Sequence, residues 1–162
     1  MRGSQRRLGE LEALYRERWA AFARVAISIA GSVEVGTEAV QEGFARAIEQ
    51  REDFRGECPL EAWVWRIVVN TAKTAGARVE REEPTEAVGR GLVSANGHRP
   101  PDVALWVRNL PERQREAVFL RYWADLDYRA IAEVLEIEVG TVSATLSAAH
   151  QSLLRSVQEV ES

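Results

Sequence analysis

Cysteine is almost absent from this sequence. Cys58 is the single cysteine among 162 residues, so the chain cannot form an internal disulfide, and a reducing compartment is expected. The shares of hydrophobic residues (46%) and charged residues (28%) are ordinary, which excludes a mainly disordered chain. We therefore expect a soluble globular protein.

Long apolar runs are also missing. The longest weakly charged stretch, residues 25–33, is far shorter than the roughly 20 residues that a membrane-spanning helix needs. The N-terminus has cations at Arg2, Arg6 and Arg7, but no apolar segment follows them, so it lacks the pattern of a signal peptide. These absences predict a cytoplasmic protein with no membrane insertion.

The residue types that form catalytic and metal sites are sparse and scattered. Cys58 has no histidine near it in the sequence, and His98 and His150 lack the spacing of metal ligands. No glycine-rich phosphate loop follows a strand, because no strand-like alternation of useful length occurs. The sequence therefore predicts no enzyme, no metal and no cofactor.

Helical periodicity is what the sequence does have. Apolar side chains recur every three or four residues, as on one face of a helix. In the first half this pattern predicts one helix over about residues 9–30, a second with Thr37 as a plausible N-cap, and a third from near Leu60. In the second half it predicts a helix with Pro111 at its first position, another capped by Asp127, and a last one from about Val139.

Between these halves the periodicity stops. Residues 82–101 contain three prolines and three glycines, which is typical of a linker. The predicted architecture is all-α: one helical domain over residues 1–81, a flexible linker over 82–102, and a second helical domain over 103–162. The last two helices of the second domain have the spacing of a helix-turn-helix.

Positive charge is missing where a DNA-reading helix would need it. Residues 130–153 contain no lysine or arginine but three glutamates, Glu133, Glu136 and Glu138. Phosphate contacts supply most non-specific affinity for DNA, and a helix N-terminus is a natural phosphate site. Glu138 lies at the expected N-terminus of the last helix, where its carboxylate would repel a phosphate.

A second candidate surface is the polar face of the second helix. Its side chains lie opposite the apolar positions Val40, Phe44 and Ile48. The pattern fits either a binding face or a solvated acidic face.

A third candidate surface is the segment 54–78. Trp63 and Trp65 point about 200° apart on a helix, so both cannot face one core, and one is expected to be partly exposed. An exposed aromatic among several cations is typical of a single-stranded nucleic-acid surface. The alternative is a buried tryptophan pair with solvated arginines.

Two long segments taken together resemble a known family. "TEAVQEGFARAIEQREDFRGECPLEAWVWRIVVNTA", followed by the linker and "LPERQREAVFLRYWADLDYRAIAEVLEIEVGTVSATL", is similar to the small extracytoplasmic-function group of bacterial RNA polymerase sigma factors. The resemblance covers roughly residues 11–81 and 103–157.

The resemblance implies three sets of site residues. The first domain would dock on the clamp of the polymerase beta-prime subunit through Glu38, Gln41, Glu42 and Ala45. It would melt and read the minus-ten promoter element through Arg55, Trp65, Arg66, Asn70 and Lys73. The second domain would bind the flap of the beta subunit and read the minus-thirty-five element, with Arg121, Tyr128, Thr141, Ser143 and Ser147 as candidate contacts. The implied partners are core RNA polymerase, promoter DNA and an anti-sigma factor as a candidate.

The last helix departs from the family pattern. A basic residue is usual at the position of Ser143 and others at or near Thr145 and Ala148, and here all three are uncharged. The chain could be a sigma factor with poor or assisted minus-thirty-five contact, a sigma-like adaptor whose acidic second domain binds a protein, or a helical enzyme. The first interpretation is the one that the sequence favours.

Overall fold

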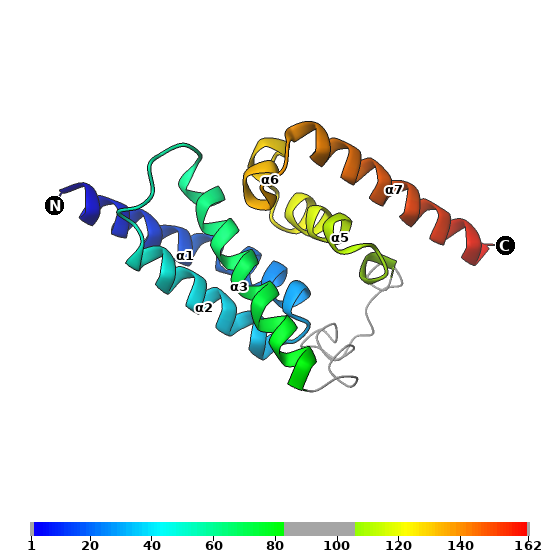
Figure 1. Ribbon diagram of the computed structural model, residues 1–162, viewed down its shortest axis with the longest axis horizontal. Coiled ribbons are helices and arrows are strands. Elements are labelled where there is room, and N and C mark those ends of the chain that lie inside the picture. The colour runs from blue at the N-terminus through cyan, green and yellow to red at the C-terminus, as the bar shows by residue number, and fades with distance from the viewer. Residues whose placement is uncertain (1, 83–105, 162) are drawn as a thin grey trace. The chain divides into compact units, whose positions relative to one another are not determined.

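The computed structural model describes residues 2–82 and 106–161 (Figure 1). All regular elements in these two ranges are helices, and the chain divides into two compact units, Met1–Gly91 and Leu92–Ser162. The prediction of an all-α fold with two helical domains is confirmed. Nearly all of the linker predicted for residues 82–102 lies outside the described residues, as does His98.

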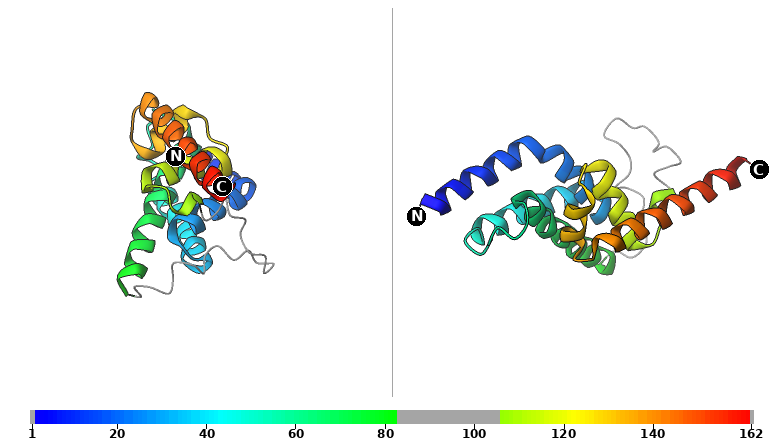
Figure 2. Two further views of the ribbon diagram at one scale, coloured as in Figure 1. Left: turned by 90° about the vertical axis from the view of Figure 1, so that its right-hand side faces the viewer. Right: turned by 90° about the horizontal axis from the view of Figure 1, so that it is seen from above.

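The first unit is a bundle of α1 (Arg2–Ala30), α2 (Val33–Glu49) and α3 (Leu60–Glu82). Each helix packs against the other two, and Figures 1 and 2 show the three side by side. The helix α1 begins at Arg2, earlier than the expected start near residue 9. Its first turns are polar, so apolar periodicity could not reveal them, and they are held by hydrogen bonds to the segment that follows α2.

The turn between α1 and α2 is shorter than expected. Gly31, at a φ of 89°, follows α1 directly, and Ser32 is the N-cap of α2, since its Oγ accepts a hydrogen bond from the Val35 N–H at 3.1 Å. The prediction that Thr37 caps this helix is wrong. Gly36 lies inside α2, where a Cβ would be 2.4 Å from Ile27 Cα, and only glycine permits that approach of two helices.

Aromatic rings form the centre of this bundle. The ring of Trp65 stacks on Phe22 with centroids 3.8 Å apart, and Phe22 meets Phe44 edge-on at 5.0 Å. Trp65 is fully buried and Trp63 is 9% exposed, so the expectation that one tryptophan is partly exposed is wrong. The reason is that α3 packs against both α1 and α2, and Phe54 from the preceding loop lies 5.3 Å from the ring of Trp63.

The second unit contains α5 (Glu112–Val118), the π-helical turn η2 (Phe119–Trp123), α6 (Tyr128–Leu135) and α7 (Val139–Glu161). Pro111 was expected at the first position of this helix, but it is the N-cap, and α5 begins one residue later at Glu112. Asp127 caps α6 as predicted, because its Oδ1 accepts a hydrogen bond from the Ala130 N–H at 2.8 Å. The helices α6 and α7 form the predicted helix-turn-helix, whose core includes Leu120, Ile131 and Leu146.

Candidate functional site

The outer face of α2 is polar and exposed. Glu38, Gln41, Glu42 and Ala45 all lie on it, with exposed side chains. Val40, Phe44 and Ala47, on the opposite side of the same helix, are buried. The four residues predicted to bind polymerase therefore share one accessible surface.

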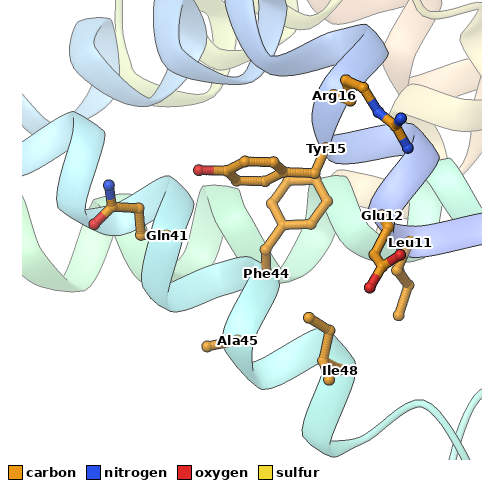
Figure 3. A pocket seen from close by; sticks show the side chains of 8 residues that line it. All are labelled: Leu11, Glu12, Tyr15, Arg16, Gln41, Phe44, Ala45 and Ile48. Atoms are coloured by element: carbon orange, nitrogen blue, oxygen red, sulfur yellow. The ribbon is translucent and has the colours of Figure 1, made fainter. Parts of the chain in front are cut away.

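A groove of about 500 Å³ lies beside this face, between α1 and α2 (Figure 3). From α2 it is lined by Gln41, Ala45 and two apolar side chains, and α1 supplies Tyr15, whose ring meets Phe44 edge-on at 5.0 Å. Figure 3 shows Glu12 and Arg16 of α1 at the same groove. The complete lining is Leu11, Glu12, Tyr15, Arg16, Gln41, Phe44, Ala45 and Ile48.

The α1 part of this groove was missed by sequence reasoning. Tyr15 lies at an apolar position of α1, where periodicity alone would place it in the core, yet it is only half-buried. The signal was present: Tyr15 and Arg16 follow Glu12 by three and four residues, the spacing that places side chains beside each other on a helix surface. The combined surface of the α2 face and this groove, which we call the α1–α2 surface, is apolar at its centre and charged at its edges.

A second surface is formed by the loop 50–59 and one side of α3. Arg66, Asn70 and Lys73 are spaced by four and three residues, so they share one side of the helix. Asn70 is exposed, whereas Arg66 and Lys73 are half-buried. Arg55 is exposed in the loop, just before Gly56, which has a φ of 77°. Three cations and an amide are thus presented by neighbouring segments.

Trp65 does not belong to this surface. Its side chain is fully buried, and its indole N–H donates a hydrogen bond to Glu61 Oε1 at 3.2 Å. The prediction that Trp65 contacts DNA is therefore wrong, because a ring stacked on Phe22 inside the bundle has no free face for a base. Phe54, which directly precedes Arg55 in the loop, is a partly exposed aromatic.

The third set of predicted residues lies on the helix-turn-helix. Thr141, Ser143 and Ser147 are exposed on α7, while Val142, Leu146 and Ala149 of the same helix are buried. Glu133, Glu136 and Glu138 are exposed as well. The accessible surface of this motif therefore carries carboxylates and hydroxyl groups, as the sequence indicated.

Arg121 and Tyr128 meet at the start of the motif. The guanidinium carbon of Arg121 lies 5.7 Å from the centroid of the Tyr128 ring, within the range of a cation–π contact. Arg121 Nη1 also donates a hydrogen bond to the carbonyl of Leu126 at 3.0 Å. Tyr128 is 38% exposed. The cation is thus held in one orientation by its own chain.

Residues 2–82 and 106–161 contain neither a cluster of metal-ligating side chains nor a membrane-spanning helix. No group of three or more His, Cys, Asp or Glu side chains there could hold a metal ion. No helix in the same ranges has the length and apolar character needed to cross a membrane.

Comparison with known proteins identifies the family. Residues 14–82 match the family model of sigma-70 region 2, and residues 106–153 match that of sigma-70 region 4. The ECF RNA polymerase sigma-E factor of Haemophilus influenzae is 30% identical over 139 residues, covering 75% of this chain and 74% of the relative. This chain belongs to the ECF group of RNA polymerase sigma factors. The sigma-E factor of Escherichia coli K12 is similar too, at 29% identity over 139 residues, with 75% and 73% covered.

Solved structures of similar fold agree with the assignment. CnrH, in complex with the cytosolic domain of CnrY, matches with a TM-score of 0.73 at 20% identity, covering 99% of this chain and 95% of that one. The sigma factor RpoE from Bartonella quintana, in complex with the anti-sigma factor NepR, matches with a TM-score of 0.70 at 20% identity, covering 91% and 98%. These likenesses concern the fold.

Family membership decides between the interpretations left open by the sequence. As a sigma factor, the protein binds core RNA polymerase and directs transcription initiation by recognising and melting promoter DNA. The adaptor interpretation is not favoured. Sigma factors are initiation factors without a catalytic step of their own.

Proposed function

We propose that the α1–α2 surface is where this sigma factor docks on the beta-prime clamp of core polymerase. Support comes from the exposure of Glu38, Gln41, Glu42 and Ala45 on one side of α2, next to an apolar groove. An apolar centre with a charged rim is the usual anatomy of a protein interface. The ion pair between Glu42 and Arg46, 2.6 Å long, would lie at that rim.

We further propose that Arg55, Arg66, Asn70 and Lys73 melt and read the minus-ten element. The observation that carries this proposal is that Arg66, Asn70 and Lys73 share one side of α3, whose other sides are buried against α1 and α2, and that Arg55 is exposed in the loop leading into this helix. Cations can follow the phosphates of a displaced strand, and the Asn70 amide can both donate to and accept from a base edge. Arg55 would approach from the loop.

The second domain is proposed to bind the beta flap and to contribute weakly to minus-thirty-five recognition. Arg121 and Tyr128 would contact the DNA, with Thr141, Ser143 and Ser147 as uncharged readers on α7. Without a cation on residues 130–153, phosphate contacts there would be few. The main grip on the promoter would then come from the first domain.

The remaining proposals concern setting and regulation. Two similar structures were solved with a bound partner, CnrY for CnrH and the anti-sigma factor NepR for RpoE, and we propose that an anti-sigma factor also holds this protein. We propose that the protein acts in the cytoplasm and has no catalytic activity, metal or cofactor of its own.

Transcription from a promoter mapped with the reconstituted holoenzyme tests the minus-ten assignment. Replacing Asn70 and Lys73 together by alanine should abolish open-complex formation, because the variant loses a base-edge contact and a phosphate contact. Core-polymerase binding, measured by co-migration, should stay unchanged. Arg24→Ala, which removes an exposed cation from α1, is the matched control and should open the promoter normally. Normal open complexes in the double variant would contradict the assignment.

A further inference from the structure

The first turns of α1 are tied to the loop 50–59. Arg7 Nη1 donates hydrogen bonds to two loop carbonyls, that of Arg51 at 2.8 Å and that of Phe54 at 3.3 Å. Its guanidinium carbon also lies 5.0 Å from the centroid of the Phe54 ring. A planar guanidinium suits this double role, since it donates in its plane and stacks through its face.

A second tie runs in the opposite direction. Arg51 Nε donates to Ser4 Oγ at 2.9 Å, and Arg51 Nη1 donates to the carbonyl of Ile48 at 2.6 Å. The last carbonyls of a helix have no partner within the helix, so this bond stabilises the end of α2. The two ties together join α1, the end of α2 and the loop.

The loop is held from its other side by α3. The Phe54 ring lies 5.3 Å from the ring of Trp63, which is buried. Phe54 is therefore fixed between a cation of α1 and an indole of α3. Arg55 follows it directly in the chain, so its backbone position is set by these contacts.

We propose that Arg7 is a positioning residue for promoter recognition, which holds the loop 50–59 so that Arg55 is in place before DNA arrives. The inference rests on the proposed minus-ten role of that loop. A loop that is already ordered loses less conformational entropy when DNA binds, so DNA affinity is higher. Ser4 and Arg7 precede residue 14, where the match to sigma-70 region 2 begins, whereas Arg51 and Phe54 lie within it, so only the α1 side of these ties is outside the segment that matches the family model.

The state of the loop can be measured directly, because Cys58 lies in it and is the single cysteine of the chain. Its rate of reaction with an aromatic disulfide reagent should rise about tenfold in Arg7→Ala, since two charge-assisted hydrogen bonds are lost. Arg6→Ala is the matched control: it removes the same charge one residue away, but the Arg6 side chain is 83% exposed and pairs with Glu10 on its own helix. Its Cys58 rate should equal that of the unchanged protein.

Function is measured by the affinity of the holoenzyme for a single-stranded oligonucleotide with the non-template minus-ten sequence of its mapped promoter. Arg7→Ala should bind about tenfold more weakly, with core-polymerase binding and the salt dependence of DNA affinity unchanged. Arg7→Lys should recover part of the affinity, because it keeps the charge and one hydrogen bond. A slope of log affinity against log salt that flattens by about 0.7 would mean that Arg7 contacts a phosphate itself, and would overturn the positioning role.

Arg55→Ala separates failure of this inference from failure of the proposed function. If Arg55→Ala binds the oligonucleotide normally, the loop does not read DNA and the proposed function of the loop is wrong. If Arg55→Ala weakens binding while Arg7→Ala and Arg7→Lys do not, the positioning role alone is wrong. An unchanged Cys58 rate in both Arg7 variants would likewise overturn it. Should Arg7→Ala fail to fold, Arg7→Lys carries both measurements.

Discussion

Adding cations to α7 should create phosphate contacts with DNA that the present sequence of this helix does not provide. Ser143 and Ser147 are both exposed and one helical turn apart, so arginine at both positions would extend from one side of the helix without displacing core residues. Val142 and Leu146, which directly precede the two serines and are buried, would keep α7 in place. Repulsion between the two arginines should cost only about 0.2–0.5 kcal/mol of helix stability.

The magnitude follows from counterion release. Each new phosphate contact on double-stranded DNA steepens the slope of log affinity against log salt by about 0.9, so two contacts add about 1.8. When the salt is raised fourfold, from about 50 to about 200 mM, both proteins lose affinity for DNA. The fold-loss should be about 12 times larger for the double variant than for the unchanged protein. At low salt the variant should bind the more tightly of the two.

Fluorescence anisotropy with the holoenzyme and a duplex of the mapped minus-thirty-five region provides the assay. A variant with glutamine at both positions, which adds length without charge, is the control and should keep the original slope. Equal slopes for the arginine and glutamine variants would refute the reasoning, because α7 would then not approach the phosphates when the sigma factor is bound to the promoter.

Two further predictions concern stability, each measured by thermal unfolding. Glu136→Gly should stabilise the second unit by about 0.5–1 kcal/mol, because Glu136 ends α6 with a φ of 56°, a conformation that is unfavourable for a residue with a Cβ. The control is Glu133→Gly, within the same helix, which should destabilise the second unit by about 1 kcal/mol. Trp65→Ala should destabilise the first unit by about 3–5 kcal/mol, as expected for a core aromatic. An unchanged unfolding temperature in Trp65→Ala would contradict the burial of Trp65 and would favour a surface position for its side chain.

Features set by short stretches of sequence could be predicted. Asp127 was recognised as a cap, because capping depends on residues within one turn of each other. Asn70 was placed correctly on an accessible side of α3, since it lies opposite buried positions of the same helix.

Features that depend on packing between helices could not be predicted from the sequence. Trp65 was assigned to the surface on the assumption of one buried side per helix, but α3 has α1 and α2 as neighbours and so buries two. Gly36 lets α2 approach Ile27 closely, a contact between two helices that no local pattern in the sequence indicates. The polar start of α1 had no apolar pattern to reveal it, because Arg7 binds loop carbonyls rather than a core.

Gly43 has a consequence for how the two proposed surfaces work together. A Cβ at this position would lie 2.7 Å from Val68 Cγ2, so α2 and α3 meet here with no spare room. Sliding or rotating one helix against the other would force atoms to overlap, so the pair moves as a single body. In the proposed docking, seating α2 on the polymerase would also fix the orientation of Asn70 and Lys73, and the residues proposed to separate the strands would keep a constant distance from the polymerase surface.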